Sequence, residues 1–108
     1  MDKNIWVVDD DESIRWVLEK GLEDGGMKVQ TFDSANKVIK KLETENPQLI
    51  LTDIRMPGPS GIDLLDKVKE MRPDIPVIVM TAHSDLDSAV ESYEHGAWEY
   101  LPKPFDIE

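Results

Sequence analysis

The chain contains no cysteine among its 108 residues, so disulfide bonds and thiolate-bound metals are excluded. It also lacks any apolar run near the roughly 20 residues that a bilayer-spanning helix requires. Its first residues, Met-Asp-Lys-Asn, do not form the basic and then apolar pattern of a targeting signal. We therefore expect a cytoplasmic protein that does not bind a membrane.

Basic residues are scarce as well. Lysine and arginine number 12 against 23 aspartates and glutamates, which gives a net charge of −11 at pH 7. Direct nucleic-acid binding is therefore disfavoured, because contacts with phosphates need a basic surface. The same excess favours cations or partners with basic surfaces. With 40% hydrophobic and 32% charged residues, the chain is typical of a single folded domain.

Short apolar or alternating runs are separated by segments of helical periodicity, which predicts an α/β fold. The runs are 5–8, 27–31, 49–51, 77–80 and 97–101. Four helices are expected between them. Three positions are typical of helix starts: Ser34, Ser60 with Asp63, and Ser84 with Asp87. Gly96 is typical of a helix end.

The composition of these runs also predicts their order in a sheet. Runs 5–8, 49–51 and 77–80 are continuously apolar, so we expect them to be buried on both faces. The other two runs are expected at the edges. The result is a doubly wound, five-stranded parallel sheet of order 2-1-3-4-5, as in flavodoxin-like folds.

Polar side chains follow the runs at the carboxyl ends of the predicted strands, where such sheets bind their ligands. They are Asp9, Asp10 and Asp11 after the first run, Asp53 after the third, Thr81 after the fourth and Lys103 after the fifth. Two carboxylates about 4 Å apart repel by roughly 4 kcal/mol at an effective dielectric of about 20. A converging set therefore needs a cation, protonation or both, and oxygen ligands without cysteine favour Mg²⁺.

Each of these residues also has a purely structural interpretation. The three consecutive aspartates are typical of a helix N-terminus, Thr81 is typical of a strand end or turn, and Lys103 can be a solvated lysine. A helix N-terminus does not explain Asp53, which follows a wholly apolar run. The acid, hydroxyl and ammonium groups together favour a site.

Four motifs in this order resemble the receiver domain of two-component response regulators. They are 7–15, 53–61, 81–83 and 103–105, and the resemblance covers essentially the whole chain. Three longer strings, 13–19, 80–87 and 100–106, are similar to those of nitrogen-regulatory, σ54-dependent activators. The resemblance implies a CheY/flavodoxin-like fold and a signalling role rather than a conventional enzyme.

The resemblance implies a role for each acidic residue. Asp53 would accept a phosphoryl group from the phosphohistidine of a sensor histidine kinase and later lose it by slow autodephosphorylation. Asp10 would bind Mg²⁺ directly, Asp9 largely through water, and Asp53 and the backbone carbonyl of Arg55 would be further ligands. Asp11 would extend the acidic cluster, and which of the three consecutive aspartates dominates is left open.

The resemblance also implies a switch. Thr81 would hydrogen-bond the phosphoryl group and Lys103 would pair with it. Recruiting Thr81 would let Tyr100, which resembles the family's switch aromatic, turn inward. The fourth helix and fifth strand would then change their surface, which in a longer protein controls a transcriptional activator.

Receivers usually end with a fifth helix, and we expect the domain 1–108 to lack it. Right-handed connections place helices two to four on one face and the first helix on the other. Five strands need about two helices per face, because a helix is about 10 Å wide and strands lie about 4.8 Å apart. Apolar residues of strands three to five should therefore be exposed, and we expect self-association through that face.

Two other functions fit the sequence less well than a receiver. A small phosphohydrolase with an aspartate nucleophile commonly needs a second acid two residues later, where this chain has Arg55. A flavin-binding module shares the sheet order, but no glycine-rich or Ser/Thr-rich phosphate loop follows the first run.

Overall fold

The computed structural model describes residues 4–82 and 86–103, without the side chains of residues 82, 86, 102 and 103. In these residues the order is β1 (Asn4–Val8), α1 (Glu12–Asp24), β2 (Lys28–Phe32), α2 (Ala35–Leu42), β3 (Leu49–Asp53), α3 (Gly61–Met71), β4 (Val77–Ala82), α4 (Leu86–Glu94) and β5 (Glu99–Lys103). None of the described helices has the length and apolar character needed to cross a membrane.

The strands form one sheet of order β2-β1-β3-β4-β5, and every neighbouring pair is parallel, as predicted. The central strands are the continuously apolar ones. In β1, for example, the four residues 5–8 are buried, whereas the edge strand β2 is partly exposed along its length. The burial pattern therefore confirms the sequence argument about which strands lie inside.

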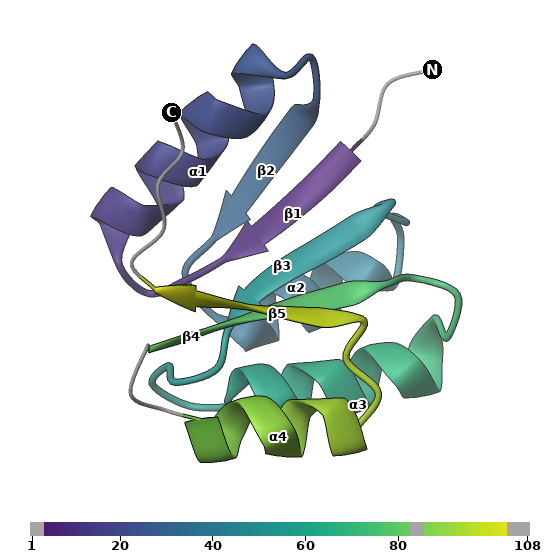
Figure 1. The fold of residues 1–108 in the computed structure, drawn as a ribbon. Helices are drawn as coiled ribbons and strands as arrows, with labels where there is room; N and C mark the ends of the chain where they lie inside the picture. The colour runs from purple at the N-terminus through teal and green to yellow at the C-terminus, as the bar shows by residue number, and fades with distance from the viewer. Residues whose placement is uncertain (1–3, 83–85, 104–108) are drawn as a thin grey trace.

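Two layers of helices enclose the sheet. Figure 1 shows α2, α3 and α4 on one face and α1 on the other, as right-handed connections require. Alternate residues of each strand point to opposite faces and so enter different cores. Trp6 and Val8 pack under α2 and α3, whereas Ile5 and Val7 pack under Leu18 of α1.

The helix starts agree with the sequence where the structure describes them. The hydroxyl of Ser34 accepts from the amide of Lys37, and Ser60 and Asp63 form a reciprocal capping box. The expected cap at Ser84 lies outside the described residues. Gly96 ends α4 with a positive φ of 98°.

The last strand begins later than the run 97–101 suggested. Ala97 is buried, and its amide donates to the carbonyl of Ser92, so it belongs to the closing turn of α4. The run therefore combines a helix end with a strand start. β3 and β4 extend beyond the apolar runs 49–51 and 77–80, so Asp53 and Thr81 lie at the carboxyl ends of their strands, as predicted.

The α1 face is exposed only in part, which corrects the expectation of a bare surface over three strands. Leu49 and Ile78 are partly buried, and Leu101 is 37% exposed. Leu51 and Met80 are nevertheless buried, because they belong to the same packed cluster as Leu18 of α1.

Candidate functional site

Three carboxylates meet at the carboxyl ends of β1 and β3. One oxygen from each of Asp9, Asp10 and Asp53 lies within 4.8 Å of the others. Asp9 is fully buried, Asp10 is exposed and Asp53 is 9% exposed. Hard oxygen ligands grouped in this way, open to solvent on one side, fit Mg²⁺ that keeps some of its waters.

Sheet register places these residues together. β1 and β3 are neighbours, with Val8 opposite Thr52, so both strands run out at the same edge. The turn after β1 is tied down at Asp9, whose amide donates to the carbonyl of Phe32 at 3.0 Å. The amide of Asp11 donates to Asp9 Oδ1 at 2.9 Å, which orients the buried carboxylate.

Asp11 is placed differently from the other two consecutive aspartates. It is the N-cap of α1, and its Oδ1 accepts from the amides of Ser13 at 2.8 Å and Ile14 at 3.3 Å. This is the helix N-terminal role that the sequence allowed for the whole triplet. The structure groups Asp9 and Asp10 with Asp53 and assigns Asp11 to the helix.

Asp53 is held by its own backbone and by the loop that follows it. Its Oδ1 accepts from the amide of Ile54 at 3.0 Å, and the hydroxyl of Thr52 donates to its carbonyl at 2.9 Å. The loop returns at Gly61, whose amide donates to the carbonyl of Ile54 at 2.7 Å. A Cβ on Gly61 would lie 2.1 Å from the carbonyl oxygen of Asp53, so this approach requires glycine.

Thr81 and Lys103 lie at the ends of the next two strands. Asp53 pairs with Met80, which precedes Thr81, and Thr81 is only 3% exposed. The backbone of Lys103 is opposite Ala82, so β5 brings it to the same edge. The side chain of Lys103 lies outside the described part of the structure, and its role stays a prediction.

The switch residues of the sequence argument lie on the α4 side of the sheet. Tyr100 is partly buried against the larger core, and its ring meets Tyr93 of α4 edge-on, with centroids 5.6 Å apart. Arg55 extends from the loop after β3 toward α4, where Nη2 is 3.5 Å from Ser88 Oγ. Through these two contacts, β5 and the loop after β3 are both connected to α4.

Sequence reasoning assigned no role to Arg15, although the residue lies in the first acidic motif. Its Nη1 donates to the carbonyl oxygen of Asp9 at 2.7 Å. The only signal in the sequence was an arginine in the first turn of the helix that follows the acids, which by itself is common.

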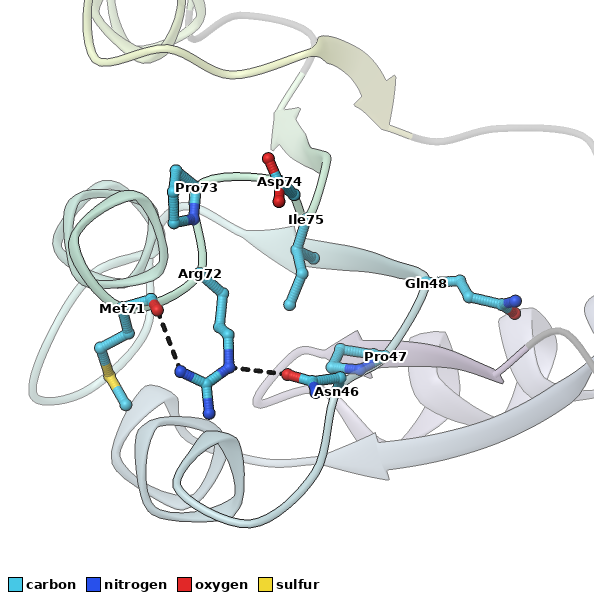
Figure 2. Close-up of a pocket in the computed structure, with 8 residues that line it drawn as sticks. All are labelled: Asn46, Pro47, Gln48, Met71, Arg72, Pro73, Asp74 and Ile75. Atoms are coloured by element: carbon cyan, nitrogen blue, oxygen red, sulfur yellow. Dashed lines mark hydrogen bonds between the residues drawn. The ribbon is translucent and has the colours of Figure 1, made fainter.

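A pocket of about 580 Å³ lies at the opposite ends of the strands and is shown in Figure 2. Arg72 is its central cation. Its guanidinium donates to Asn46 Oδ1 at 2.6 Å and to the carbonyls of Met71 at 3.0 Å and Leu42 at 2.9 Å. These carbonyls end α3 and α2, so Arg72 stabilises two helix C-termini rather than offering its charge to a ligand.

The response regulator receiver domain model matches residues 5–108. The chain belongs to the response regulator receiver family. It is 57% identical to the DNA-binding transcriptional regulator NtrC of Proteus hauseri over 105 residues, which are 97% of this chain and 22% of that protein.

Solved structures agree with this assignment. The apo receiver domain of NtrC has a TM-score of 0.87 at 54% identity, and the match covers 99% of this chain and 87% of that one. NtrX of Brucella abortus, solved with ADP, has a TM-score of 0.93 at 31% identity and covers 99% of this chain and 25% of that one. This receiver domain is therefore of the NtrC type, and it spans about a fifth of the length of the NtrC proteins it matches.

Proposed function

We propose that this receiver domain takes a phosphoryl group onto Asp53 from a sensor histidine kinase in a Mg²⁺-dependent reaction. The observation that supports it most is the meeting of Asp9, Asp10 and Asp53 within 4.8 Å, at the edge where β4 and β5 also end. Asp53 is the member of this group that comes from the strand beside Thr81.

In the proposed reaction, a carboxylate oxygen of Asp53 bonds to phosphorus while the phosphorus–nitrogen bond of the phosphohistidine breaks. The electron pair of that bond stays on the imidazole. Asp9, Asp10, Asp53 and the backbone carbonyl of Arg55 would hold Mg²⁺, which supplies positive charge to the phosphoryl oxygens. Lys103 would pair with another oxygen, and Thr81 would donate its hydroxyl to a third.

Phosphorylation replaces one negative charge with about −2 and adds strong acceptors. Thr81 would move toward them, Tyr100 would turn inward and α4 would shift with β5. That is a population shift between two arrangements of one fold. Because the relatives are DNA-binding transcriptional regulators, we propose that the shift controls a transcriptional activator in a longer protein.

Four further properties belong to this proposal. The phosphoryl group would be lost slowly by autodephosphorylation. The domain would act in the cytoplasm, and its net charge of −11 argues against direct nucleic-acid contact. Copies of this chain would also associate through the α1 face of the sheet.

The experiment is phosphorylation by acetyl phosphate followed by mass spectrometry. The wild type should gain one stable phosphoryl group only when Mg²⁺ is present. Asp53→Asn should fold and gain none. Asp74→Asn, which removes an exposed acid near the opposite pocket, should behave as wild type.

Asp10→Ala extends the same experiment to the metal. It should lose most Mg²⁺ affinity, while the metal-free variant stays as stable as wild type or becomes more stable, because one repelling carboxylate is gone. Phosphorylation of Asp53→Asn at the wild-type rate would exclude Asp53 as the acceptor. Rapid turnover of acetyl phosphate without an adduct would favour the phosphohydrolase.

A further inference from the structure

The turn between β1 and α1, which carries Asp9 and Asp10, is held from the helix side by Arg15. We propose that Arg15 is a positioning residue for the carboxylate site: its 2.7 Å hydrogen bond to the Asp9 carbonyl fixes the turn so that both carboxylates meet Asp53. This inference rests on the Mg²⁺-dependent function proposed for that site.

The amide, the carboxylate and the carbonyl of Asp9 each form a hydrogen bond, and Arg15 is the donor to the carbonyl. Its amide donates to the carbonyl of Phe32 in β2, and its Oδ1 accepts from the amide of Asp11. Its carbonyl accepts from the guanidinium of Arg15. These partners come from a neighbouring strand, the turn itself and the helix, so the Asp9 backbone cannot rotate without breaking one of them.

The first turn of α1 holds Arg15 rigidly in place. Asp11 caps α1 through its side chain, and its carbonyl accepts from the amide of Arg15 at 3.1 Å. Arg15 is therefore bonded to the turn twice, by its amide at Asp11 and by its guanidinium at Asp9. The acidic turn and the first turn of α1 form one closed ring of hydrogen bonds.

Such support matters because the carboxylates that it brings together repel one another. Without a restraint the turn would relax by moving Asp10 away from Asp53, and Mg²⁺ would have to reassemble the site when it binds. A charge-assisted hydrogen bond at the carbonyl opposes that relaxation. Residues that orient the metal ligands without binding the metal themselves typically account for about a 10–100-fold difference in metal affinity.

A positioning role and a simple charge effect predict opposite signs. The pKa of Asp33 is lowered mainly by the hydrogen bond from Lys37, and the charge of Arg15 is near enough to lower it further. A cation beside a Mg²⁺ site repels the metal, so removing it should tighten binding if charge alone mattered. If positioning dominates, removing it should weaken binding.

The test is Mg²⁺ titration of the whole chain by calorimetry, without a phosphoryl donor. Arg15→Ala should bind Mg²⁺ about tenfold more weakly or worse. Arg15→Lys, which keeps the charge and one donor, should recover part of the loss. Lys20→Ala removes the same charge from an exposed position of α1 and should bind as wild type or slightly more tightly.

Amide hydrogen exchange of the metal-free protein gives a second readout. The Asp11 amide, which donates to Asp9 Oδ1, should exchange faster in Arg15→Ala while amides in β3 keep their protection. Unchanged or tighter Mg²⁺ binding by Arg15→Ala, or an equal loss in Lys20→Ala, would overturn the inference. A wild type that binds no Mg²⁺ would contradict the proposed function instead, and exchange at Asp11 would still decide whether Arg15 holds the turn.

Discussion

Gly61 shows how a single residue places the proposed phosphoacceptor. The loop after β3 leaves Asp53 and returns to the strand so closely that a Cβ at position 61 would lie 2.8 Å from Ile54 Cα as well as 2.1 Å from the Asp53 carbonyl. The Asp53 carbonyl ends β3, and Ile54 is the buried residue that directly follows the strand. The glycine is therefore required by the close approach of two backbone segments.

Gly61→Ala should destabilise the domain, because the added methyl group meets backbone that cannot move aside. We expect a loss of about 2–3 kcal/mol or more in the free energy of unfolding, as for overpacked cores. Urea denaturation would measure it. Gly26→Ala is the matched control: its φ of 86° costs strain, but nothing lies within 4 Å of its Cβ. A loss in Gly61→Ala no larger than that in Gly26→Ala would show that the close approach at Gly61 costs little.

At the same scale, the sequence predicted which residues lie at the site better than it predicted what each one does. Asp53 followed an apolar run, and strand order alone brought it to Asp9 and Asp10. Asp11 could not be separated from its neighbours by residue type, because an aspartate serves equally as a metal ligand and as a helix cap. No role was predicted for Arg15, because its contact is with a backbone carbonyl, which carries no sequence signal.

At the scale of elements, α3 and α4 are joined by a contact between His95 and Asp66. His95 Nδ1 lies 2.6 Å from Asp66 Oδ1, and its other ring nitrogen faces Glu91 at 3.9 Å. The hydrogen bond with Asp66 raises the pKa of His95 above its usual 6.5, and the charges of Asp66, Glu91 and Glu94 act in the same direction. His95 directly follows α4, so the pair fixes that end of the proposed switch helix to α3.

The raised pKa of His95 fixes the sign of a pH effect. The unfolded chain has the lower pKa, so the contribution of the pair to stability is complete below pH 6.5 and is lost as pH rises through the folded pKa. Thermal unfolding should therefore show wild type more stable than Asp66→Asn at low pH, with the difference shrinking at higher pH. Glu70→Gln, on the same helix, should show no such convergence, and a difference independent of pH would exclude the pair as its cause.

Element boundaries were harder to predict than element types. The run 97–101 is apolar except for Glu99, yet its first residue closes α4 and Trp98 lies exposed before β5. Periodicity cannot divide a run between a helix end and a strand start, because both bury apolar residues. Serine caps and the capping box were predicted because their side chains act within one turn.

At the scale of the whole molecule, the two faces of the sheet differ. The face under α2, α3 and α4 holds the larger core, whereas α1 is the one described helix on the other face. A groove of about 490 Å³ remains there, lined by Ile5, Met27, Gln48, Leu49, Pro76, Ile78 and Trp98. Trp98 lies at the margin of this groove and is 73% exposed, so a large apolar surface is in contact with water.

We expect copies of this chain to associate through that groove, with Trp98 as the main contact. The net charge of −11 opposes association, so added salt should strengthen it by screening repulsion, whereas an association held by ion pairs would weaken. Sedimentation over a wide range of concentration, at low and high salt, measures both effects.

Trp98→Ser should shift the chain toward monomer. Trp16→Ser is the matched control, because Trp16 of α1 is 59% exposed but does not line the groove. A wild type that stays monomeric at high concentration and high salt, or equal effects of the two substitutions, would show that this face does not drive assembly.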